Sequence, residues 1–500
     1  MRRLTDAAVG VLMGAAAALY LSAWPNNLGT SDEAYYLFHA KRLLAGEVLY
    51  RDMFDFITPL FTDLMAVLFR LFGAGMTTAR TFNAVVHGGI VLVVYLTCRA
   101  AGVRTGLAAT AAVAHLALGQ PAWQYASPHW TSTLVTGLLL WASLDRRWAR
   151  QRGGLVVQGL LLGVLLALQQ QKGVVMGAAL TALLLADVAF DRRGGGPPGP
   201  PLARSLFILA AGALTVVGPL MAFHLASAGL EPIVHQLVLH PFTGYGRLNR
   251  SAWGAVNVLT TPMAAYVWPQ VLTYLPLVIP VDLLRVVTGW VARGDRQRIE
   301  RPLVLAVFAS ASAASILYFP DFIHVAFIAP VFFVCIAEAL EAGLARLDRT
   351  GTVLGRAIAV ALLVCFGWRL RDNLARARAE FPIARETAFG RVDFASERDA
   401  ALIERVRGLV EGAGSREIFC YPAGAAVYLM TDTDNPTPHE IILPVYQSDE
   451  EIERTIATLE ARRVPVVVLY KVLVGRDDPV GEYVRTHYAC DEDGLCVRNP

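Results

Sequence analysis

The chain has 500 residues, of which 55% are hydrophobic and only 17% are charged. Soluble globular domains carry about 25% charged residues, so this composition excludes an ordinary soluble protein and requires a lipid bilayer to cover the apolar excess. The formal net charge of +3 is small for this length and gives no reason to expect nucleic acid as a partner.

Long apolar runs occupy most of the chain. A helix needs roughly 17 to 25 mainly apolar residues to cross the hydrocarbon of a bilayer. We therefore predict a mainly α, polytopic membrane bundle of about eleven spans, at residues 7–24, 82–101, 106–121, 131–144, 155–171, 174–190, 205–228, 264–291, 303–319, 322–340 and 353–368. The first run is long enough to span and further runs follow it, so we interpret it as a membrane helix and not as a cleaved signal peptide.

Arginines in alternate connections set the predicted orientation, because cytoplasmic loops of membrane proteins collect Lys and Arg. With the N-terminus inside, every predicted inside loop is basic, at residues 99–104, 146–152, 192–193, 293–301 and 346–356. We therefore expect a cytoplasmic N-terminus and a first extracytoplasmic loop at about residues 25–80. Within that loop, residues 59–72 predict a helix that lies on the outer membrane surface, since a crossing there would invert every later loop.

Near residue 370 the composition changes to that of a soluble α/β domain. We predict helices at 397–410 and 449–462 and strands at 417–421 and 465–470, in a small parallel sheet of three or four strands. The chain is thus divided into a membrane domain, 1–370, and an extracytoplasmic domain, 371–500. Cys490 and Cys496 flank a turn-like segment and form either a hairpin disulfide or two unpaired thiols.

Polar residues gather at the predicted outer ends of the spans. Transfer of a sugar from a lipid phosphate needs a base for the acceptor proton and fixed positive charge for the departing phosphate. We take Asp32 as the candidate base, with Glu33 beside it as a second catalytic candidate. The candidate substrate- and phosphate-binding residues are Arg51, Tyr125, His129, Lys172, Arg247, Arg250, Asp321 and His324. No metal-ligand spacing is evident, but Asp32, Asp55 and Asp321 could supply oxygen ligands for a divalent cation if they converge.

Structural alternatives exist for four of these candidates, Asp32, Glu33, Lys172 and His324. Thr30 and Glu33 have capping-box spacing, so the two acids could simply begin a helix. Lys172 could extend its ammonium to the membrane interface, although the three glutamines before it indicate a polar cavity. His324, on an apolar helix, could be a packed histidine without a catalytic role.

The first-loop sequence also carries a family resemblance. The segments 31–36 (Ser-Asp-Glu-Ala-Tyr-Tyr), 43–52 and 58–60 resemble the first extracytoplasmic loop of membrane GT-C glycosyltransferases, such as protein O-mannosyltransferases and the lipid A aminoarabinose transferase. The resemblance implies an inverting transferase that uses a polyprenyl-phosphate-linked sugar and has Asp32 as its catalytic acid group, with Glu33 beside it. One departure concerns a Lys-Pro-Pro segment of many relatives, which is Thr58-Pro59-Leu60 here and lacks the lysine expected at the lipid phosphate.

These observations predict a glycosyltransferase, hexosyl- or pentosyl-, in a bacterial inner membrane. Its donor would be a polyprenyl-phosphate sugar, and its acceptor an extracytoplasmic glycan, lipid or protein. The alternative is a polytopic transporter of a polar or lipid-linked substrate, which would show internal repeats and ionisable groups near the bilayer midplane. A non-catalytic membrane scaffold that displays the outer domain is a third reading, which the clustered polar residues disfavour.

Overall fold

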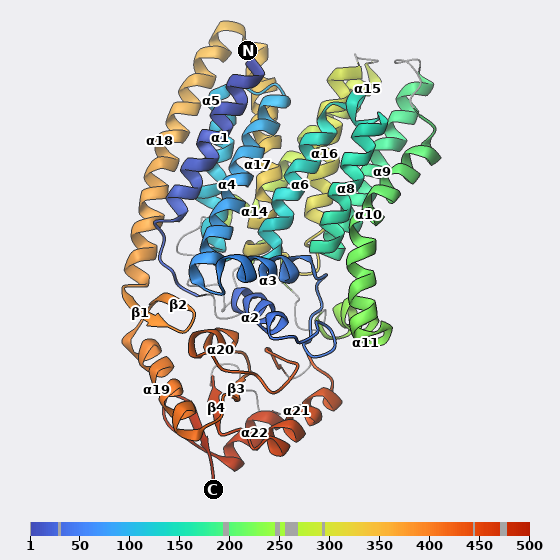
Figure 1. Ribbon diagram of the computed structural model, residues 1–500. Helices are drawn as coiled ribbons and strands as arrows, with labels where there is room; N and C mark the ends of the chain where they lie inside the picture. The colour runs from blue at the N-terminus through green and yellow to red at the C-terminus, as the bar shows by residue number, and fades with distance from the viewer. Residues whose placement is uncertain are drawn as a thin grey trace.

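The computed structural model describes residues 2–28, 32–193, 200–245, 251–255, 269–292, 296–443, 446–470 and 478–500. Long helices form an upright bundle, and a small α/β domain lies below it (Figure 1). The bundle helices are α1 (Arg2–Leu21), α4 (Met76–Ala100), α5 (Thr105–Ala114), α6 (Pro128–Leu144), α8 (Arg152–Leu168), α9 (Gln170–Arg192), α10 (Leu202–Ala228), α15 (Val278–Val291), α16 (Arg296–Ala314), α17 (Phe322–Leu344) and α18 (Asp348–Glu380). The predicted polytopic helical fold is confirmed.

Six stretches of the described residues are apolar and long enough to cross a membrane. They are Leu4–Leu21, Met76–Ala100, Gln170–Arg192, Leu202–Ala228, Gln270–Val291 and Phe322–Glu380, the last of which runs through both α17 and α18. The other expected spans correspond to helices that are shorter or less apolar, and the first residues of the run at 264–291 lie outside the described residues. The number of about eleven spans and the orientation therefore stay predictions.

Small residues bring neighbouring bundle helices close together. A methyl group on Gly159 of α8 would lie 2.6 Å from the Leu209 carbonyl oxygen of α10, and one on Gly163 would lie 2.5 Å from that of Ala213. Only glycine fits such a contact. Close backbone approach is the usual way in which helices pack inside a bilayer, where lipid removes the hydrophobic drive for association.

The first loop folds into two helices below the bundle, α2 (Asp32–Leu44) and α3 (Leu60–Phe72). In Figure 1, α3 lies across the lower end of the bundle helices and does not run along them. This placement agrees with the expected surface helix at residues 59–72. Short helices near the same end are η1 (His115–Gly119), η2 (Gln120–Ala122), α11 (Leu230–Val234), η3 (His235–Leu239), η4 (Pro241–Tyr245) and α14 (Pro269–Thr273).

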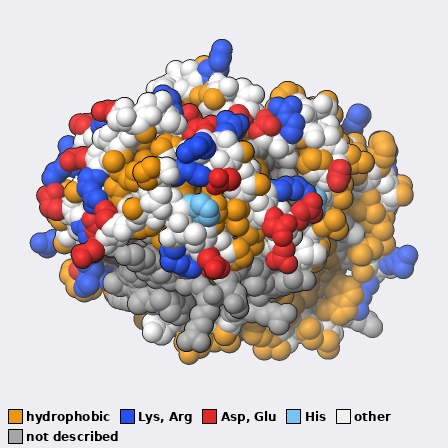
Figure 2. Space-filling view, turned by 90° about the horizontal axis from the view of Figure 1, so that it is seen from below, with side chains coloured by type: hydrophobic (Ala, Val, Ile, Leu, Met, Phe, Trp, Pro, Cys, Tyr) orange, Lys and Arg blue, Asp and Glu red, His pale blue; other side chains and the backbone are white. Residues whose placement is uncertain are grey.

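Helix α18 continues past residue 370 and leads into the lower domain, so the division of the chain into two domains stays a prediction. The elements that follow are β1 (Ile383–Thr387), β2 (Gly390–Phe394), α19 (Glu397–Ala413), β3 (Ile418–Tyr421), α20 (Ala425–Thr431), α21 (Asp449–Ala461), β4 (Val466–Leu469), α22 (Pro479–His487), β5 (Tyr488–Cys490) and β6 (Leu495–Arg498). Seen from below, acidic and basic side chains are interspersed across this end of the molecule (Figure 2).

The main sheet corrects one expectation. Its order is β3-β4-β6-β5, and only β3 and β4 are parallel, because β5 and β6 form an antiparallel hairpin that adds to β4. A purely parallel sheet was therefore the wrong expectation, although the strand number of four agrees with it. Cys490 and Cys496 face each other across the hairpin and form a disulfide.

Candidate active site

The two adjacent acids of the first loop have different surroundings. Asp32 is the first residue of α2, and its side chain is exposed. Glu33 is 0% exposed. It forms an ion pair with Arg80 at the start of α4, with one N–O distance of 2.9 Å, and accepts the Ala126 backbone N–H at 2.8 Å. Thr30, whose capping role was an alternative for this stretch, lies outside the described residues.

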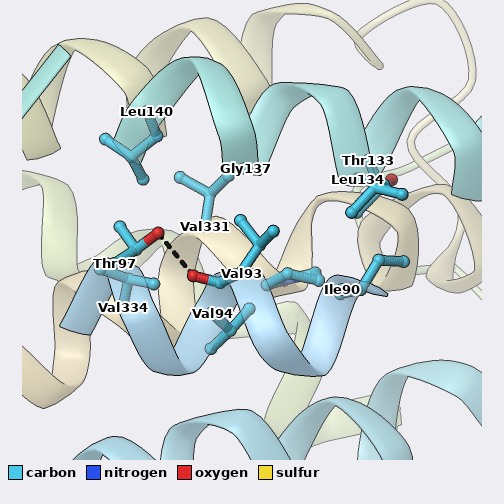
Figure 3. A pocket seen from close by; sticks show the side chains of 11 residues that line it. Ile90, Val93, Val94, Thr97, Thr133, Leu134, Gly137, Leu140, Val331 and Val334 are labelled. Carbon is cyan, nitrogen blue, oxygen red and sulfur yellow. Dashed lines mark hydrogen bonds between the residues drawn. The ribbon is translucent and has the colours of Figure 1, made fainter. Parts of the chain in front are cut away.

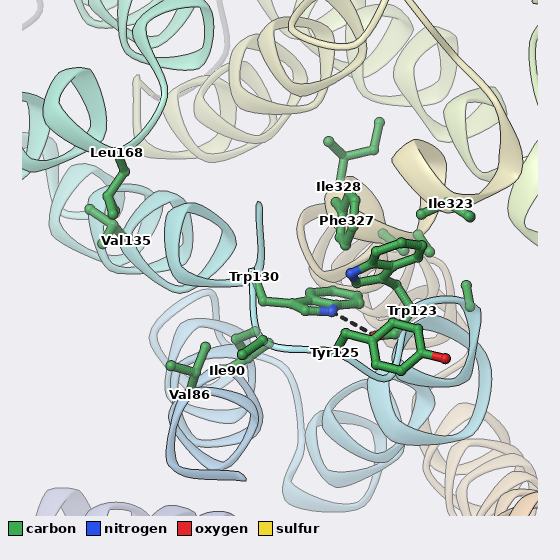
Figure 4. Close-up of a cluster of buried hydrophobic side chains, with 14 of the residues drawn as sticks. Val86, Ile90, Trp123, Tyr125, Trp130, Val135, Leu168, Ile323, Phe327 and Ile328 are labelled. Atoms are coloured by element: carbon green, nitrogen blue, oxygen red, sulfur yellow. Dashed lines mark hydrogen bonds between the residues drawn. The ribbon is translucent and has the colours of Figure 1, made fainter. Parts of the chain in front are cut away.

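Tyr125 belongs to the buried wall behind Glu33. Its hydroxyl accepts a hydrogen bond from Asn27 at 2.9 Å, and its ring centroid lies 5.8 Å from the Arg80 guanidinium. Figure 4 shows Tyr125 beside Trp123, and the indole N–H of Trp130 donates to the Trp123 carbonyl oxygen at 2.8 Å. These bulky rings fix the segment between η2 and α6, and thereby the Ala126 N–H that binds Glu33.

A second polar group connects the starts of α6, α9 and α17. The Lys172 ammonium donates to the Ser132 hydroxyl at 2.8 Å, and that hydroxyl lies 2.6 Å from Oε1 of Gln169. Gln169 Nε2 is 2.8 Å from Nδ1 of His129, whose ring lies 5.2 Å from the His324 ring. We call this set, from Lys172 to His324, the polar chain.

Asp321 orients the far end of the polar chain. Its carboxylate caps α17 by accepting the His324 backbone N–H at 2.9 Å, and the same oxygen lies 2.7 Å from Nδ1 of His324. Asp321 therefore caps the helix and also fixes the orientation of the His324 imidazole. The structure thus brings together four sequence-predicted residues, His129, Lys172, Asp321 and His324.

In the polar chain, Lys172 is a buried basic side chain that has no acidic partner among the described residues. Its side chain is only 4% exposed, and no Asp or Glu oxygen of the described residues lies within 4.0 Å of its ammonium. Burying an ammonium without an opposite charge is costly, so such groups are retained where a ligand supplies that charge. A lysine that extends its ammonium to the membrane interface would instead have that ammonium exposed.

Half-buried aromatic rings link Asp32 to the polar chain. Tyr245 lies between three of them, with centroid distances of 5.0 Å to Phe56, 5.8 Å to Tyr318 and 6.1 Å to Tyr446. We call these four rings the aromatic cluster. Tyr318 also lies 5.6 Å from His324. Burial, followed by the negative charge of Asp32, raises the pKa of the Tyr446 phenol well above its usual range.

The start of α9 also contacts the first loop directly. The Gln170 side-chain amide donates to the Phe56 carbonyl oxygen at 2.8 Å and accepts the Thr58 N–H at 3.3 Å. Gln170 stands two residues before Lys172, so this contact ties the lysine-bearing helix to the loop that carries Asp32.

One predicted residue, Arg51, is not brought to this group. Arg51 is exposed and bonds to its neighbour Asp52, with Nε–Oδ1 and Nη2–Oδ2 distances of 3.0 and 2.8 Å. Arg247 and Arg250 lie outside the described residues. Asp55, a predicted cation ligand, lies 3.6 Å from His39, and no cluster of three His, Cys, Asp or Glu side chains suited to a metal ion occurs in the described part of the chain.

An apolar hollow elsewhere in the bundle has a different character. It lies between α4, α6 and α17 and is lined by side chains such as Ile90, Val93 and Leu140 (Figure 3). Its two threonines, Thr97 and Thr133, both donate to backbone carbonyl oxygens at 2.6 Å. No charged group lines it, so it cannot hold a phosphate.

Sequence reasoning missed Arg80, Ser132, Tyr318 and Tyr446. Arg80 had a signal, since an arginine at the outer start of an apolar run needs a partner. Ser132 is an ordinary helix residue, and Tyr446 lies far along the chain in the lower domain. Nothing local distinguishes either residue from its neighbours.

No protein-family model and no curated protein sequence matches this chain. Solved structures do match its fold. The crystal structure of ArnT from Cupriavidus metallidurans bound to undecaprenyl phosphate superposes with a TM-score of 0.59 at 15% identity, over 98% of this chain and 97% of that chain. The apo structure of the same protein gives a TM-score of 0.56 at 13% identity over the same shares. ArnT is a GT-C glycosyltransferase, so the resemblance in the first loop is confirmed at the level of the fold.

Proposed function

We propose that this protein is a membrane glycosyltransferase that moves a sugar from a polyprenyl-phosphate donor to an extracytoplasmic acceptor in a bacterial inner membrane. The observation that carries the proposal is the buried Lys172 ammonium, which has no carboxylate partner among the described residues and belongs to the polar chain that ends at His324. The ArnT fold supports it, because that neighbour was solved with undecaprenyl phosphate bound. The likeness extends over nearly the whole length of both chains.

In the proposed reaction, Asp32 acts as the base. Its exposed carboxylate accepts the proton of the acceptor hydroxyl, whose oxygen attacks the anomeric carbon from the side opposite the phosphate. The new glycosidic bond forms as the bond between the anomeric carbon and the phosphate oxygen breaks, with inversion at that carbon. The lipid phosphate leaves with one further negative charge, which the Lys172 ammonium stabilises. Asp32 then releases the proton to water.

Glu33 has a supporting role in this proposal. Its carboxylate is already held by Arg80 and the Ala126 N–H, so we assign it to fixing the first turn of α2. The polar chain orients the remaining groups, since Asp321 holds His324 and Gln169 bonds to His129. Preorganised groups of this kind need no rearrangement as charge develops.

Binding of the lipid product tests the proposal. The full chain in nanodiscs should bind undecaprenyl phosphate but not undecaprenol, and Lys172→Met should weaken undecaprenyl phosphate binding about 10- to 100-fold, because a charge-assisted contact contributes about 1.5 to 3 kcal/mol. Lys41→Met is the matched control, since Lys41 already pairs with Asp432 at 2.6 Å. Equal binding of the phosphate by wild type and Lys172→Met would contradict the proposed role of the lysine.

Transfer itself is measured with a panel of synthetic undecaprenyl-phosphate hexoses and pentoses and membrane extract as the acceptor source. We expect release of undecaprenyl phosphate from at least one donor and a product with inverted anomeric configuration. A chain that releases undecaprenyl phosphate from no donor of either class, or that retains the configuration, would contradict the proposal.

A further inference from the structure

The lower domain binds α2 through a buried cluster of charged side chains that have no direct role in the proposed reaction. Oε2 of Glu440 lies 2.7 Å from Nε2 of His39, and its other carboxylate oxygen accepts a hydrogen bond from Arg42. Glu440 is 2% exposed, His39 is 0% exposed and Arg42 is 6% exposed. We call these three residues the α2 clamp.

Further contacts extend the clamp along α2 and the first loop. Arg42 also donates to Glu47 at 2.6 and 2.9 Å and to the Thr437 carbonyl oxygen at 3.3 Å. The Phe54 N–H donates to the Pro438 carbonyl oxygen at 2.8 Å. The lower domain therefore holds both the helix that begins at Asp32 and the loop that precedes Phe56.

Aromatic stacking adds apolar area to this interface. The Phe38 ring of α2 stacks on Tyr428 of α20 at a centroid distance of 4.8 Å with an interplanar angle of 17°. Both rings are fully buried. Since α2 is only 13 residues long, a short helix of this kind depends on tertiary packing for its position, and here much of that packing comes from the lower domain.

The segment that carries Glu440 also brings an aromatic ring to the site. Tyr446 lies 4.8 Å from the His240 ring and 6.1 Å from Phe56, by centroids. The neighbouring Gln447 stabilises the local backbone. Its side chain accepts a hydrogen bond from the Leu443 N–H and donates one to the Ile441 carbonyl oxygen, both at 2.8 Å. Tyr446 is only half-buried, so part of its surface remains available.

We propose that the lower domain is a component of the active site, in which Glu440 is a positioning residue that fixes α2 and thereby Asp32, and the Tyr446 ring lines the sugar subsite. The proposal rests on the proposed function. An aromatic ring offers a large flat apolar area, on which the C–H face of a sugar ring can pack. The subsite lies next to the Asp32 carboxylate, where the acceptor oxygen must meet the anomeric carbon.

The clamp and the ring should affect different kinetic constants. A misplaced base raises the barrier of the chemical step, and a displacement of about 1 Å can cost about 100-fold in rate. Glu440→Gln should therefore lower kcat about 10- to 100-fold with little change in KM for the donor. Tyr446→Leu should raise the donor KM about tenfold with a smaller effect on kcat, and Tyr446→Phe should stay near wild type because the ring is retained.

Hydrogen exchange supplies a readout that needs no activity. Loss of the clamp should speed amide exchange in α2 while α4 and the lower-domain sheet keep their protection. Asp432→Asn is the matched control, because it breaks the Lys41–Asp432 pair, which is more exposed and joins the same two regions. If Glu440→Gln does not fold, His39→Asn is used in its place. This variant removes the His39–Glu440 contact while Arg42 still neutralises Glu440, and we expect the same lower kcat and faster α2 exchange.

Wild-type kcat and wild-type α2 exchange in the clamp variant would overturn the positioning role of Glu440. Wild-type donor KM in Tyr446→Leu would overturn the sugar subsite. A wild-type chain that is inactive with every donor contradicts the proposed function instead, and the exchange experiment still tests the clamp in that case.

Discussion

The two ends of helix α9 differ in how their buried charged side chains are paired. At the upper end in Figure 1, carboxylates of α9 neutralise arginines of two segments, in the pairs Arg146–Asp187 at 2.5 Å, Arg150–Asp191 at 2.7 Å and Arg296–Asp191 at 2.8 Å. At the lower end, the same helix α9 begins with Lys172, whose ammonium bonds to a neutral hydroxyl. The paired charges stabilise the fold, whereas Lys172 has no carboxylate partner among the described residues and, in our proposal, binds the lipid phosphate.

The two adjacent acids of the first loop also differ from each other, in their burial. Glu33 is neutralised by Arg80 and buried, whereas Asp32 is exposed. We propose that paired, buried charges hold the structure and that Asp32 and Lys172 act on the substrate, so each variant below should affect one class of residue and spare the other.

The largest effect is expected for Asp32→Asn. The amide cannot accept the acceptor proton, and general base catalysis contributes about 10²- to 10⁴-fold, so turnover should fall by that factor while undecaprenyl phosphate still binds. The measurement is release of undecaprenyl phosphate from the active donor. Asp348→Asn, at an exposed position at the upper end, is the matched control. An Asp32→Asn protein with wild-type turnover would remove Asp32 from the mechanism.

Asp187→Asn should affect stability and leave binding intact. Asp187 contacts both Arg146 and Arg296, so its loss leaves buried positive charge without compensation, at a cost of about 3 to 5 kcal/mol. We expect a clear fall in the thermal unfolding midpoint and unchanged affinity of the folded protein for undecaprenyl phosphate. Weaker lipid binding without loss of stability would show that the upper end is not purely structural.

Lys172→Met should give the opposite pattern. Removing an unpaired buried ammonium relieves a desolvation cost, so the unfolding midpoint without ligand should stay the same or rise by the equivalent of about 1 kcal/mol. Added undecaprenyl phosphate should then stabilise the variant less than it stabilises wild type. Strong destabilisation of the ligand-free variant would mean that Lys172 has a structural partner.

The smallest effect is a pH dependence of the α2 clamp. Burial lowers the pKa of His39, but Glu440 and Asp55 raise it overall to about 9. Because this folded-state pKa exceeds the unfolded value of about 6.5, the stabilisation is complete below about pH 6.5 and is lost as the pH rises through about 9. The groups facing the imidazole are Glu440, Asp55, Arg42 and the Tyr35 ring, at a centroid distance of 4.1 Å from His39.

Amide exchange in α2 should therefore become faster as the pH rises from about 8 to about 10, a window centred on the His39 pKa of about 9. The measured rates are first corrected for the intrinsic pH dependence of exchange. His39→Asn should show no such step. A step of equal size in the variant would assign it to another group.

Much of the fold followed from apolar periodicity. Helices cover most described residues of the expected spans, because long apolar runs favour helices. The lower sheet was predicted less well. The stretch at 488–498 had been recognised only as a cysteine-flanked turn, and its antiparallel addition to β4 depends on which edge of the sheet is open, which no local pattern encodes.

By itself, the sequence determined that this is a polytopic membrane protein with an acidic first loop and polar residues at one end of its spans. Tertiary structure decided which acid is buried, since one residue along a helix rotates a side chain by about 100° and gives neighbours different surroundings. It also decided the long-range partners, such as His39 with Glu440, 401 positions later. Hydropathy acts on segments and can be read locally, whereas the partner of a buried charge depends on how the whole chain packs.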